Sequence, residues 1–338
     1  MNKFKFIVGI DISKKTFDAA LLKAGNSGII IHRCFEQSQA GYALFVKWLT
    51  DNGATLDQQV LICLEHTGIY INGLVRFLVS TAAGIWVEMP LRIKKSMGLQ
   101  RGSDDKIAAI NIAQYAYRFQ GQARLWKPVD TTLQQLRSLL AQRDRLVLTL
   151  SQLSVPLNEM EACGNQADAK QLKRLQQKAI TGLQKSLEAV EQAIDDKICA
   201  DEQINKVIGQ VTSIKGVGKQ TAIKLYVYTR GFSAFENGKQ LACYCGVVPF
   251  GKSSGTSVRY KPGVSPFANK NLKKLLHLCA MSALRWDAEI RAYYLRKVGE
   301  GKNKMSVINA IRNKILQRIF AVVRDGRYYV ENYSYAGA

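Results

Sequence analysis

The chain has 338 residues, enough for two domains and a connecting element, and its hydrophobic fraction of 47% supports sizeable cores. It contains no run of 18 apolar residues, and its N-terminus turns acidic too early for a signal peptide, so we expect a soluble cytoplasmic protein without a membrane partner. The net charge is +22, and residues 206–330 hold 23 Lys and Arg against five Asp and Glu. This bias predicts a nucleic acid partner, the alternative being a basic surface that serves solubility alone.

Residues 1–125 alternate predicted strands with predicted helices, which is typical of an α/β domain. The strand predictions depend on apolar runs and on alternation of apolar with polar positions, and the helix predictions depend on helical spacing. In chain order we expect strands over 4–13 and 15–25, a helix over 41–53, a strand over 60–64, a helix over 71–84, a short strand over 85–90 and a helix beginning near residue 104.

The sequence pattern changes at two further points, near residues 126 and 206. Residues 126–205 repeat leucines at helical spacing and are rich in Gln, Lys and Ala, which predicts a connector of two antiparallel helices or a coiled coil. Pro156 and Gly164 are the turn signals within it. Residues 206–330 combine short helical patterns, glycine-rich turns and dense basic charge, and form a second predicted domain, followed by a tail over 331–338.

Three acidic residues occupy places where ligands gather in α/β proteins. Asp11 and Glu65 follow predicted buried strands, and the carboxyl ends of such strands meet at one edge of a sheet. Asp105 lies in the first turn of a predicted helix that packs on the same sheet. Carboxylates that converge there would bind Mg²⁺ or Mn²⁺. Each acid alone has a structural alternative, since Asp11 and Glu65 are typical of strand ends and Asp104 and Asp105 of helix caps.

The basic region contains a glycine turn with the spacing of a helix-hairpin-helix. In IKGVGKQTA, Gly216 and Gly218 permit close approach of a phosphate, the following helix N-terminus favours an anion, and Lys215 and Lys219 add positive charge. We therefore expect phosphate contact at this turn, with a plain connection between two helices as the alternative. His32, His66 and His277 form no triad-like pattern.

Three segments together resemble one known family. They are GIDISKKTFDAAL, CLEHTGIY and SDDKIAAINIAQYAYRF, in this order and at this spacing. They resemble the RuvC-like domain of DEDD insertion-sequence transposases, the family that includes Piv-type DNA invertases and bridge-RNA-guided recombinases. The resemblance extends through the basic domain. It implies a RuvC-like (RNase H-like) mixed-sheet α/β domain, a helical coiled-coil connector and an all-α basic C-terminal transposase domain with a helix-hairpin-helix.

The resemblance implies a four-acid metal cluster, of which this chain supplies three. Asp11 matches the acid of the GID strand end, Glu65 the acid of E-x-TG, and Asp105 the first acid of a D-x-x-D-A helix start. The fourth position then falls on Ala108, so we expect at least one weakened metal site and an impaired or inactive enzyme. In the other possible register, Asp104 is the third acid and Ile107 takes the fourth position. We prefer Asp105 because Ala109 then matches the alanine of the motif.

The same resemblance implies a nucleophilic serine in an S-G element that follows a proline. Pro249 and then Ser254 with Gly255 match it, while Ser257 and, more weakly, Ser253 are competitors. By composition alone this stretch predicts a flexible Gly/Ser-rich loop leading into a basic helix. Cations that would neutralise an attacked phosphate accompany the serine: Lys252, Arg259 and Lys261.

The function that this resemblance implies is site-specific DNA recombination or transposition by a mobile element. Double-stranded target and donor DNA, a structured non-coding bridge RNA, and further copies of the chain in a homodimer or homotetramer are the implied partners, in the bacterial cytoplasm at the nucleoid. Composite active sites would combine domains of different subunits. Two alternatives remain: a metal-dependent, structure-selective nuclease of the junction-resolvase type, and a non-catalytic nucleic-acid-binding protein.

Overall fold

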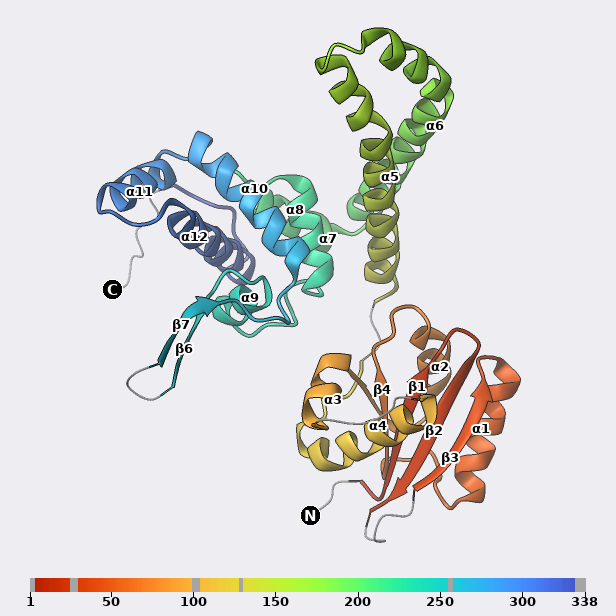
Figure 1. Cartoon of the computed structure of the whole chain (residues 1–338). Coiled ribbons are helices and arrows are strands. Elements are labelled where there is room, and N and C mark those ends of the chain that lie inside the picture. The colour runs from red at the N-terminus through yellow and green to blue at the C-terminus, as the bar shows by residue number, and fades with distance from the viewer. Residues whose placement is uncertain (1–3, 25–29, 99–103, 128–129, 255–257, 332–338) are drawn as a thin grey trace. The chain divides into compact units, whose positions relative to one another are not determined.

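The computed structural model describes residues 4–24, 30–98, 104–127, 130–254 and 258–331, with the backbone alone over 251–262 (Figure 1). The chain divides into two compact units, residues 1–128 and 129–338. Within the described ranges, no helix combines the length and the hydropathy of a membrane-spanning segment.

The first unit is built on one mixed sheet of five strands in the order β3-β2-β1-β4-β5. The strands are β1 (Phe6–Ile12), β2 (Thr16–Lys23), β3 (Ile30–Glu36), β4 (Val60–Glu65) and β5 (Gly84–Glu88). β2 runs antiparallel to both β1 and β3, whereas β4 runs parallel to both β1 and β5. The mixed-sheet α/β domain predicted from the sequence is confirmed. β3 is a strand that the sequence did not predict, because it lies at the edge of the sheet and buries only Phe35.

Helices cover both faces of this sheet. α1 (Gln39–Asp51) and α2 (Ile71–Leu78) bury apolar side chains with one face, and α3 (Pro90–Ser96) and α4 (Asp105–Phe119) do so with the other. A short 3₁₀ turn, Gln120–Gln122, follows α4. The two predicted helices on the first face exist, but α2 ends six residues before the predicted boundary.

Gly9 in β1 determines how closely α4 approaches the sheet. A Cβ atom at Gly9 would lie 2.2 Å from the backbone nitrogen of Ala113 and 2.3 Å from the carbonyl oxygen of Ala109. Only glycine permits such an approach of one backbone to another. The backbone of α4 therefore rests directly on β1, four residues after Asp105.

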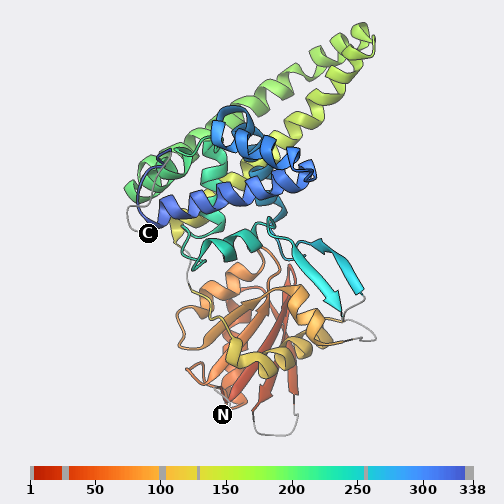
Figure 2. The ribbon, with the colours of Figure 1, turned by 90° about the vertical axis from the view of Figure 1, so that its left-hand side faces the viewer.

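The second unit begins with a long helical hairpin. α5 (Thr131–Ala162) and α6 (Gln166–Cys199) pack side by side along the hairpin, which Figure 2 shows with its closed end at the top. The chain reverses at Gly164, whose φ of 92° favours glycine. The other expected turn signal is wrong, because Pro156 lies inside α5. The bases of both helices contribute to the core of the second unit, through residues that include Leu136 and Ile194.

Further helices complete the second unit around this core. They are α7 (Glu202–Thr212), α8 (Lys219–Tyr228), α9 (Gly238–Tyr244), α10 (Lys270–Trp286), α11 (Ala288–Gly299) and α12 (Lys304–Arg324). Between α9 and α10 the chain forms an antiparallel hairpin of β6 (Phe250–Ser254) and β7 (Val258–Gly263). The sequence predicted only a loop here, since its Gly and Ser content hides the strand pattern. The largely helical character of this region is confirmed.

Candidate metal-binding carboxylate site

Two of the predicted acids lie on neighbouring parallel strands. Asp11 is the penultimate residue of β1 and Glu65 is the last residue of β4. The register of β1 and β4 pairs Ile10 with Leu64, the residues immediately before these acids. Because successive side chains alternate between the faces of a sheet, the carboxylates of Asp11 and Glu65 point to the same face at its C-terminal edge. Both residues are partly buried.

The start of α4 adds a third acid to this edge. Asp104 is the N-cap residue, and its carboxylate accepts a hydrogen bond from the backbone N–H of Ile107 at 2.7 Å. Asp105 is the first residue of the helix, and its charge acts on Asp11. The capping role of Asp104 and the electrostatic coupling of Asp105 support Asp105 as the third acid of the motif.

The electrostatics of the site are those of uncompensated negative charge. Burial raises the pKa of Asp11, the charge of Asp105 and then that of Asp18 raise it further, and a backbone hydrogen bond from Ile12 opposes them. Burial also raises the pKa of Glu65, with a further contribution from the charge of Asp11. Every charge that shifts these two pKa values belongs to another carboxylate among the described residues.

Two further acids, Asp18 and Glu88, lie in the same row of the sheet. Asp18 on β2 pairs in register with Asp11, and Glu88 on β5 pairs with Glu65. Four adjacent strands thus each contribute one carboxylate to one face. Neither outer acid was predicted from the sequence. The alternating apolar residues after Asp11 predict a second strand, and a tight turn between the two strands would place Asp18 opposite Asp11. This pattern could have identified Asp18.

Hydrogen-bond partners distinguish the outer acids from the inner ones. Asp18 is 8% exposed, and its Oδ1 lies 2.7 Å from Nε2 of His32. Glu88 is 6% exposed; it accepts hydrogen bonds from the backbone N–H of Met89 at 2.8 Å and from the Tyr115 hydroxyl at 3.1 Å. Burial and the Glu88 charge raise the pKa of Tyr115 to about 12. The outer acids are therefore held by hydrogen bonds of the fold, whereas Asp11 interacts unfavourably with the charges of both Asp105 and Glu65.

The carboxylate oxygens of the inner acids Asp11, Glu65 and Asp105 are suitable ligands for a hard divalent cation. Carboxylate oxygens that repel one another are the ligands that Mg²⁺ and Mn²⁺ take, and a cation would relieve the repulsion. Near Glu65, the buried hydroxyl of Thr67 has no hydrogen-bond partner among the described residues. In the part of the chain that the structure describes, no three His, Cys, Asp or Glu side chains already converge at metal-ligand distances. Ala108, partly buried one turn after Asp105, brings no ligand.

The predicted phosphate-binding turn connects α7 to α8. Gly216 has a φ of 88°, and a Cβ atom there would lie 2.7 Å from the backbone nitrogen of Ala283 on α10. This glycine therefore serves the packing of the turn against α10. Gly218 is the N-cap of α8. The Lys215 ammonium pairs with Glu331, and that of Lys219 with Asp195 at 2.8 Å, so a phosphate would compete with these carboxylates.

The predicted nucleophile ends the first strand of the β6–β7 hairpin. Ser254 is the last residue of β6 and pairs in register with Val258, while Ser253 pairs with Arg259. Lys252 also lies in β6 and Lys261 in β7, so the hairpin carries the serine and all three predicted cations. The competing Ser257 lies outside the described residues.

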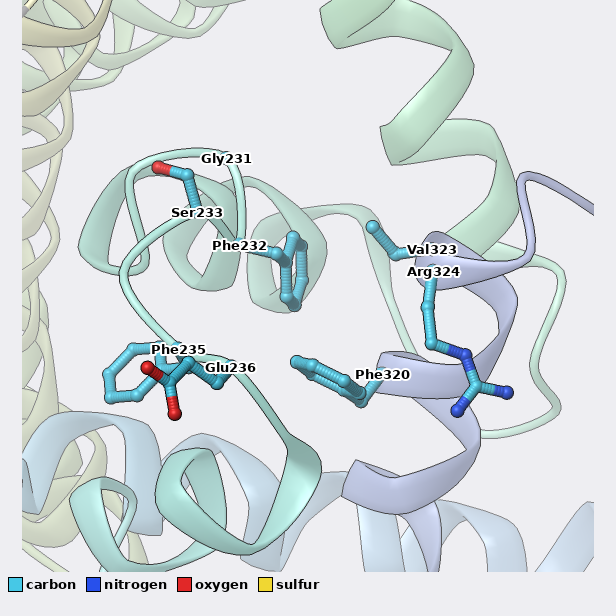
Figure 3. A pocket seen from close by; sticks show the side chains of 8 residues that line it. All are labelled: Gly231, Phe232, Ser233, Phe235, Glu236, Phe320, Val323 and Arg324. Atoms are coloured by element: carbon cyan, nitrogen blue, oxygen red, sulfur yellow. The ribbon is translucent and has the colours of Figure 1, made fainter.

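One cavity of about 310 Å³ lies in the second unit, between the α8–α9 loop and the end of α12. Figure 3 shows the Phe232 and Phe320 rings and the Arg324 side chain at its walls. None of the predicted site residues lines it. The carboxylate edge, and not this cavity, is therefore the site that the sequence motifs identify.

Comparison with protein families gives two matches. A DEDD transposase model of the IS110 type matches residues 8–160, and the model "Transposase IS116/IS110/IS902 family" matches residues 209–295. Thermus thermophilus RuvC, alone and in complex with a Holliday junction substrate, matches among solved structures with a TM-score of 0.27 in both cases and with 10% and 9% identity, over 36% of this chain and 99% of that chain.

Similar proteins match over very different lengths. The pilin gene-inverting protein of Moraxella bovis is 28% identical over 96% of this chain and 97% of its own length, and that of Moraxella lacunata matches equally. An uncharacterized 43.6 kDa protein of insertion element IS110 from Streptomyces coelicolor is 31% identical over 44% of this chain and 38% of its own length. The chain belongs to the IS110/IS116 family of DEDD transposases and Piv-like DNA recombinases, as the resemblance of its acidic motifs predicted.

Proposed function

We propose that this chain performs site-specific DNA recombination with Asp11, Glu65 and Asp105 as ligands of Mg²⁺ or Mn²⁺ and with Ser254 as the nucleophile. The observation that carries the metal assignment is the meeting of the Asp11, Glu65 and Asp105 charges, from β1, β4 and α4, without a compensating cation. The similarity to pilin gene-inverting proteins over nearly the whole chain supports recombination, rather than cleavage alone, as the outcome.

The proposed reaction is a transesterification at phosphorus. The Oγ–P bond to Ser254 forms while the bond from phosphorus to a deoxyribose oxygen breaks; the serine loses its proton, and the departing oxygen gains one. The phosphoserine bond conserves the energy that rejoining requires. A bound divalent cation would supply stabilisation of the negative charge that develops on the phosphate. Lys252, Arg259 and Lys261 share the hairpin with the serine and would neutralise the phosphate that it attacks.

The proposed partners are double-stranded target and donor DNA, a structured bridge RNA that selects them, and further copies of the chain. The positive charge of the second unit supports the nucleic acid partners. In the turn from Lys215 to Lys219, the Gly218 cap leaves the N-terminus of α8 as a phosphate contact. Exposed apolar residues on the α5–α6 hairpin support assembly of several chains.

Replacement of the serine tests the proposed reaction. Ser254→Ala removes the nucleophilic oxygen, so covalent protein–DNA adducts and strand transfer should both disappear. Each is measured on a supercoiled plasmid that carries the DNA flanking the gene, with the RNA that co-purifies with the protein. Ser257→Ala is the matched control and should retain both products. Cleavage that persists in Ser254→Ala without adducts would instead identify a nuclease that uses water.

Ala108 favours one other function for this particular chain, that of an impaired or non-catalytic form that still binds nucleic acid. An Ala at the fourth position of the motif leaves the cluster one ligand short, which weakens metal binding without affecting the basic second unit. Gain of recombination in Ala108→Asp would identify the chain as an inactive version of an active enzyme.

A further inference from the structure

Two arginines of α12 are buried in opposite environments. The side chain of Arg318 is 12% exposed, and its guanidinium donates to Asp287 at 2.8 Å and to Glu289 at 2.5 Å. Arg312, two turns earlier, is 7% exposed as a whole residue and has no carboxylate within ion-pair distance among the described residues. All 26 Asp and Glu residues of the chain lie within the described ranges.

The hydrogen-bond partners of Arg312 carry no negative charge. Its Nη2 lies 2.7 Å from Nδ1 of His277 on α10, and its Nη1 donates to Oδ1 of Asn309 at 3.4 Å. Its Nε–H is buried without a hydrogen-bond partner among the described residues. Since a guanidinium only donates, Nδ1 of His277 must accept, which places the ring proton on Nε2. The Nε2–H of His277 and the remaining Nη hydrogens of Arg312 therefore stay available as donors.

An arrangement of this kind is costly for the protein by itself. Burial lowers the pKa of Arg312, but an arginine stays protonated at neutral pH, so the charge cannot be shed. Buried charges in stable folds are paired, and an uncompensated one destabilises the structure that holds it. Local conflicts of this kind are expected at functional sites. An anion is the partner that would neutralise Arg312.

The surroundings of this guanidinium are those of a nucleic acid contact. Lys273 and Lys274 precede His277 by one turn of α10, on its side of the helix, and neither has a carboxylate partner in the described part of the chain. Asn309, which accepts from Arg312, donates from Nδ2 to the carbonyl oxygen of Val247 at 2.7 Å. Val247 lies three residues before β6, so this cluster also holds the base of the β6–β7 hairpin.

We propose that Arg312 and His277 form a binding site for one backbone phosphate of the nucleic acid on which this recombinase acts. The inference rests on the nucleic-acid-binding part of the proposed function and on neither the nucleophile nor the metal. The phosphate supplies the negative charge that the fold lacks, and it accepts from the free Nη hydrogens and from Nε2 of His277. A phosphodiester of DNA and one of RNA share this chemistry.

Arg312→Met tests the site, with Arg318→Met as the matched control. Both changes remove one buried cation from α12 and change the net charge equally. Binding of the full-length chain to a 30-base-pair duplex DNA and to a single-stranded 30-nucleotide RNA is measured by fluorescence anisotropy at several salt concentrations. In Arg312→Met, the slope of log K against log salt should fall by about 1, uniformly across sequences. In Arg318→Met the slope should stay unchanged.

Denaturant unfolding of the same variants supplies a second readout. Arg312→Met should unfold at the same or a higher denaturant concentration than the unmodified chain, because it removes an unpaired buried charge, whereas Arg318→Met should unfold at a lower one. Loss of slope on the duplex alone assigns the phosphate to DNA, and loss on the single strand alone assigns it to RNA.

Three outcomes overturn the proposal. The first is an unchanged slope on both probes in a folded Arg312→Met variant. The second is an equal loss of slope in both variants, which would make Arg312 one general charge among many. The third is unfolding of Arg312→Met at lower denaturant, which would show that the guanidinium stabilises the fold. An unmodified chain that binds neither probe would contradict the proposed function as well, whereas loss of strand transfer in Ser254→Ala has no bearing on this binding test.

Discussion

Two adjacent aspartates at the start of α4 have different roles, and the distinction is geometric. Asp104 caps the helix by accepting from the backbone N–H of Ile107, while the charge of Asp105 raises the pKa of Asp11. Sequence spacing favoured Asp105 through the match of Ala109 to the motif, and the burial of Ala109 against β1 agrees with that register. The pairing of Asp18 with His32 was not predictable, because β3 itself was not.

Restoring an acid at the fourth position should strengthen metal binding. Residues three apart share a helix face, so an aspartate at 108 is aimed as Asp105 is. Ala108→Asp should bind Mn²⁺ roughly tenfold or more tightly by calorimetry, since even the loss of a residue that only supports a metal ligand typically changes metal affinity about tenfold or more. Ile107→Asp, which corresponds to the other register, is the matched control and should change the affinity little. Tighter binding in Ile107→Asp alone would make Asp104 the third acid.

At the scale of elements, the buried strands were predicted from the sequence and the strands without continuous apolar runs were not. β1, β4 and β5 are central or parallel strands with continuous apolar runs, and the sequence placed all three. The β6–β7 hairpin and the edge strand β3 carry no such runs and were missed. Pro156 misled because proline usually ends helices, yet α5 continues through it. In the second unit, α11 is held on α12 by Glu289, which accepts from Lys314 and Arg318 at 2.5 Å each.

The α11–α12 contact should depend on pH. The hydrogen bond from Lys314, and then the charges of Arg318 and Lys314, lower the pKa of Glu289 from its ordinary value of 4.5, with burial opposing them. Because the folded-state pKa is the lower one, this carboxylate stabilises the fold above about pH 4.5, and the contribution is lost as the pH falls through the lowered pKa. Urea unfolding should therefore show Glu289→Gln less stable than the unmodified chain at pH 7, with the difference closing at low pH.

An exposed acid provides the control for this pH dependence. Glu188→Gln on α6 replaces a carboxylate that has no ion pair among the described residues, so it should not alter the stability at either pH. A difference between Glu289→Gln and the unmodified chain that stays constant with pH would show that the carboxylate charge does not stabilise the contact.

At the scale of the whole molecule, only part of the α5–α6 hairpin contributes to the hydrophobic core of the second unit. Its base packs into the second unit, but its closed half exposes Val155, Leu172 and Leu175. The sequence predicted the two long helices from leucine spacing, but not which leucines stay uncovered, because that depends on the register between the helices. Exposed apolar side chains that lie together on a surface are typical of an interface.

Charges placed on the closed half of the hairpin should therefore weaken assembly. Val155→Glu with Leu175→Glu puts two carboxylates among these apolar residues and should lower the molar mass measured by light scattering, while circular dichroism stays unchanged. Leu295→Glu on α11, an equally exposed leucine away from the hairpin, should leave the mass unaltered. An unchanged mass in the double variant would remove the hairpin as the assembly surface.

The direct contact between the backbones of β1 and α4 at Gly9 positions α4 without using the side chains of its first turn. Because α4 is seated on β1 through backbone atoms, its position does not depend on which side chains occupy its first turn. Residues 105 and 108 are thus free to vary while the helix stays where it is. Under the proposed function, one substitution at residue 105 or 108 would remove or restore a metal ligand and switch catalysis off or on, while the fold that positions the helix and the basic second unit would stay intact.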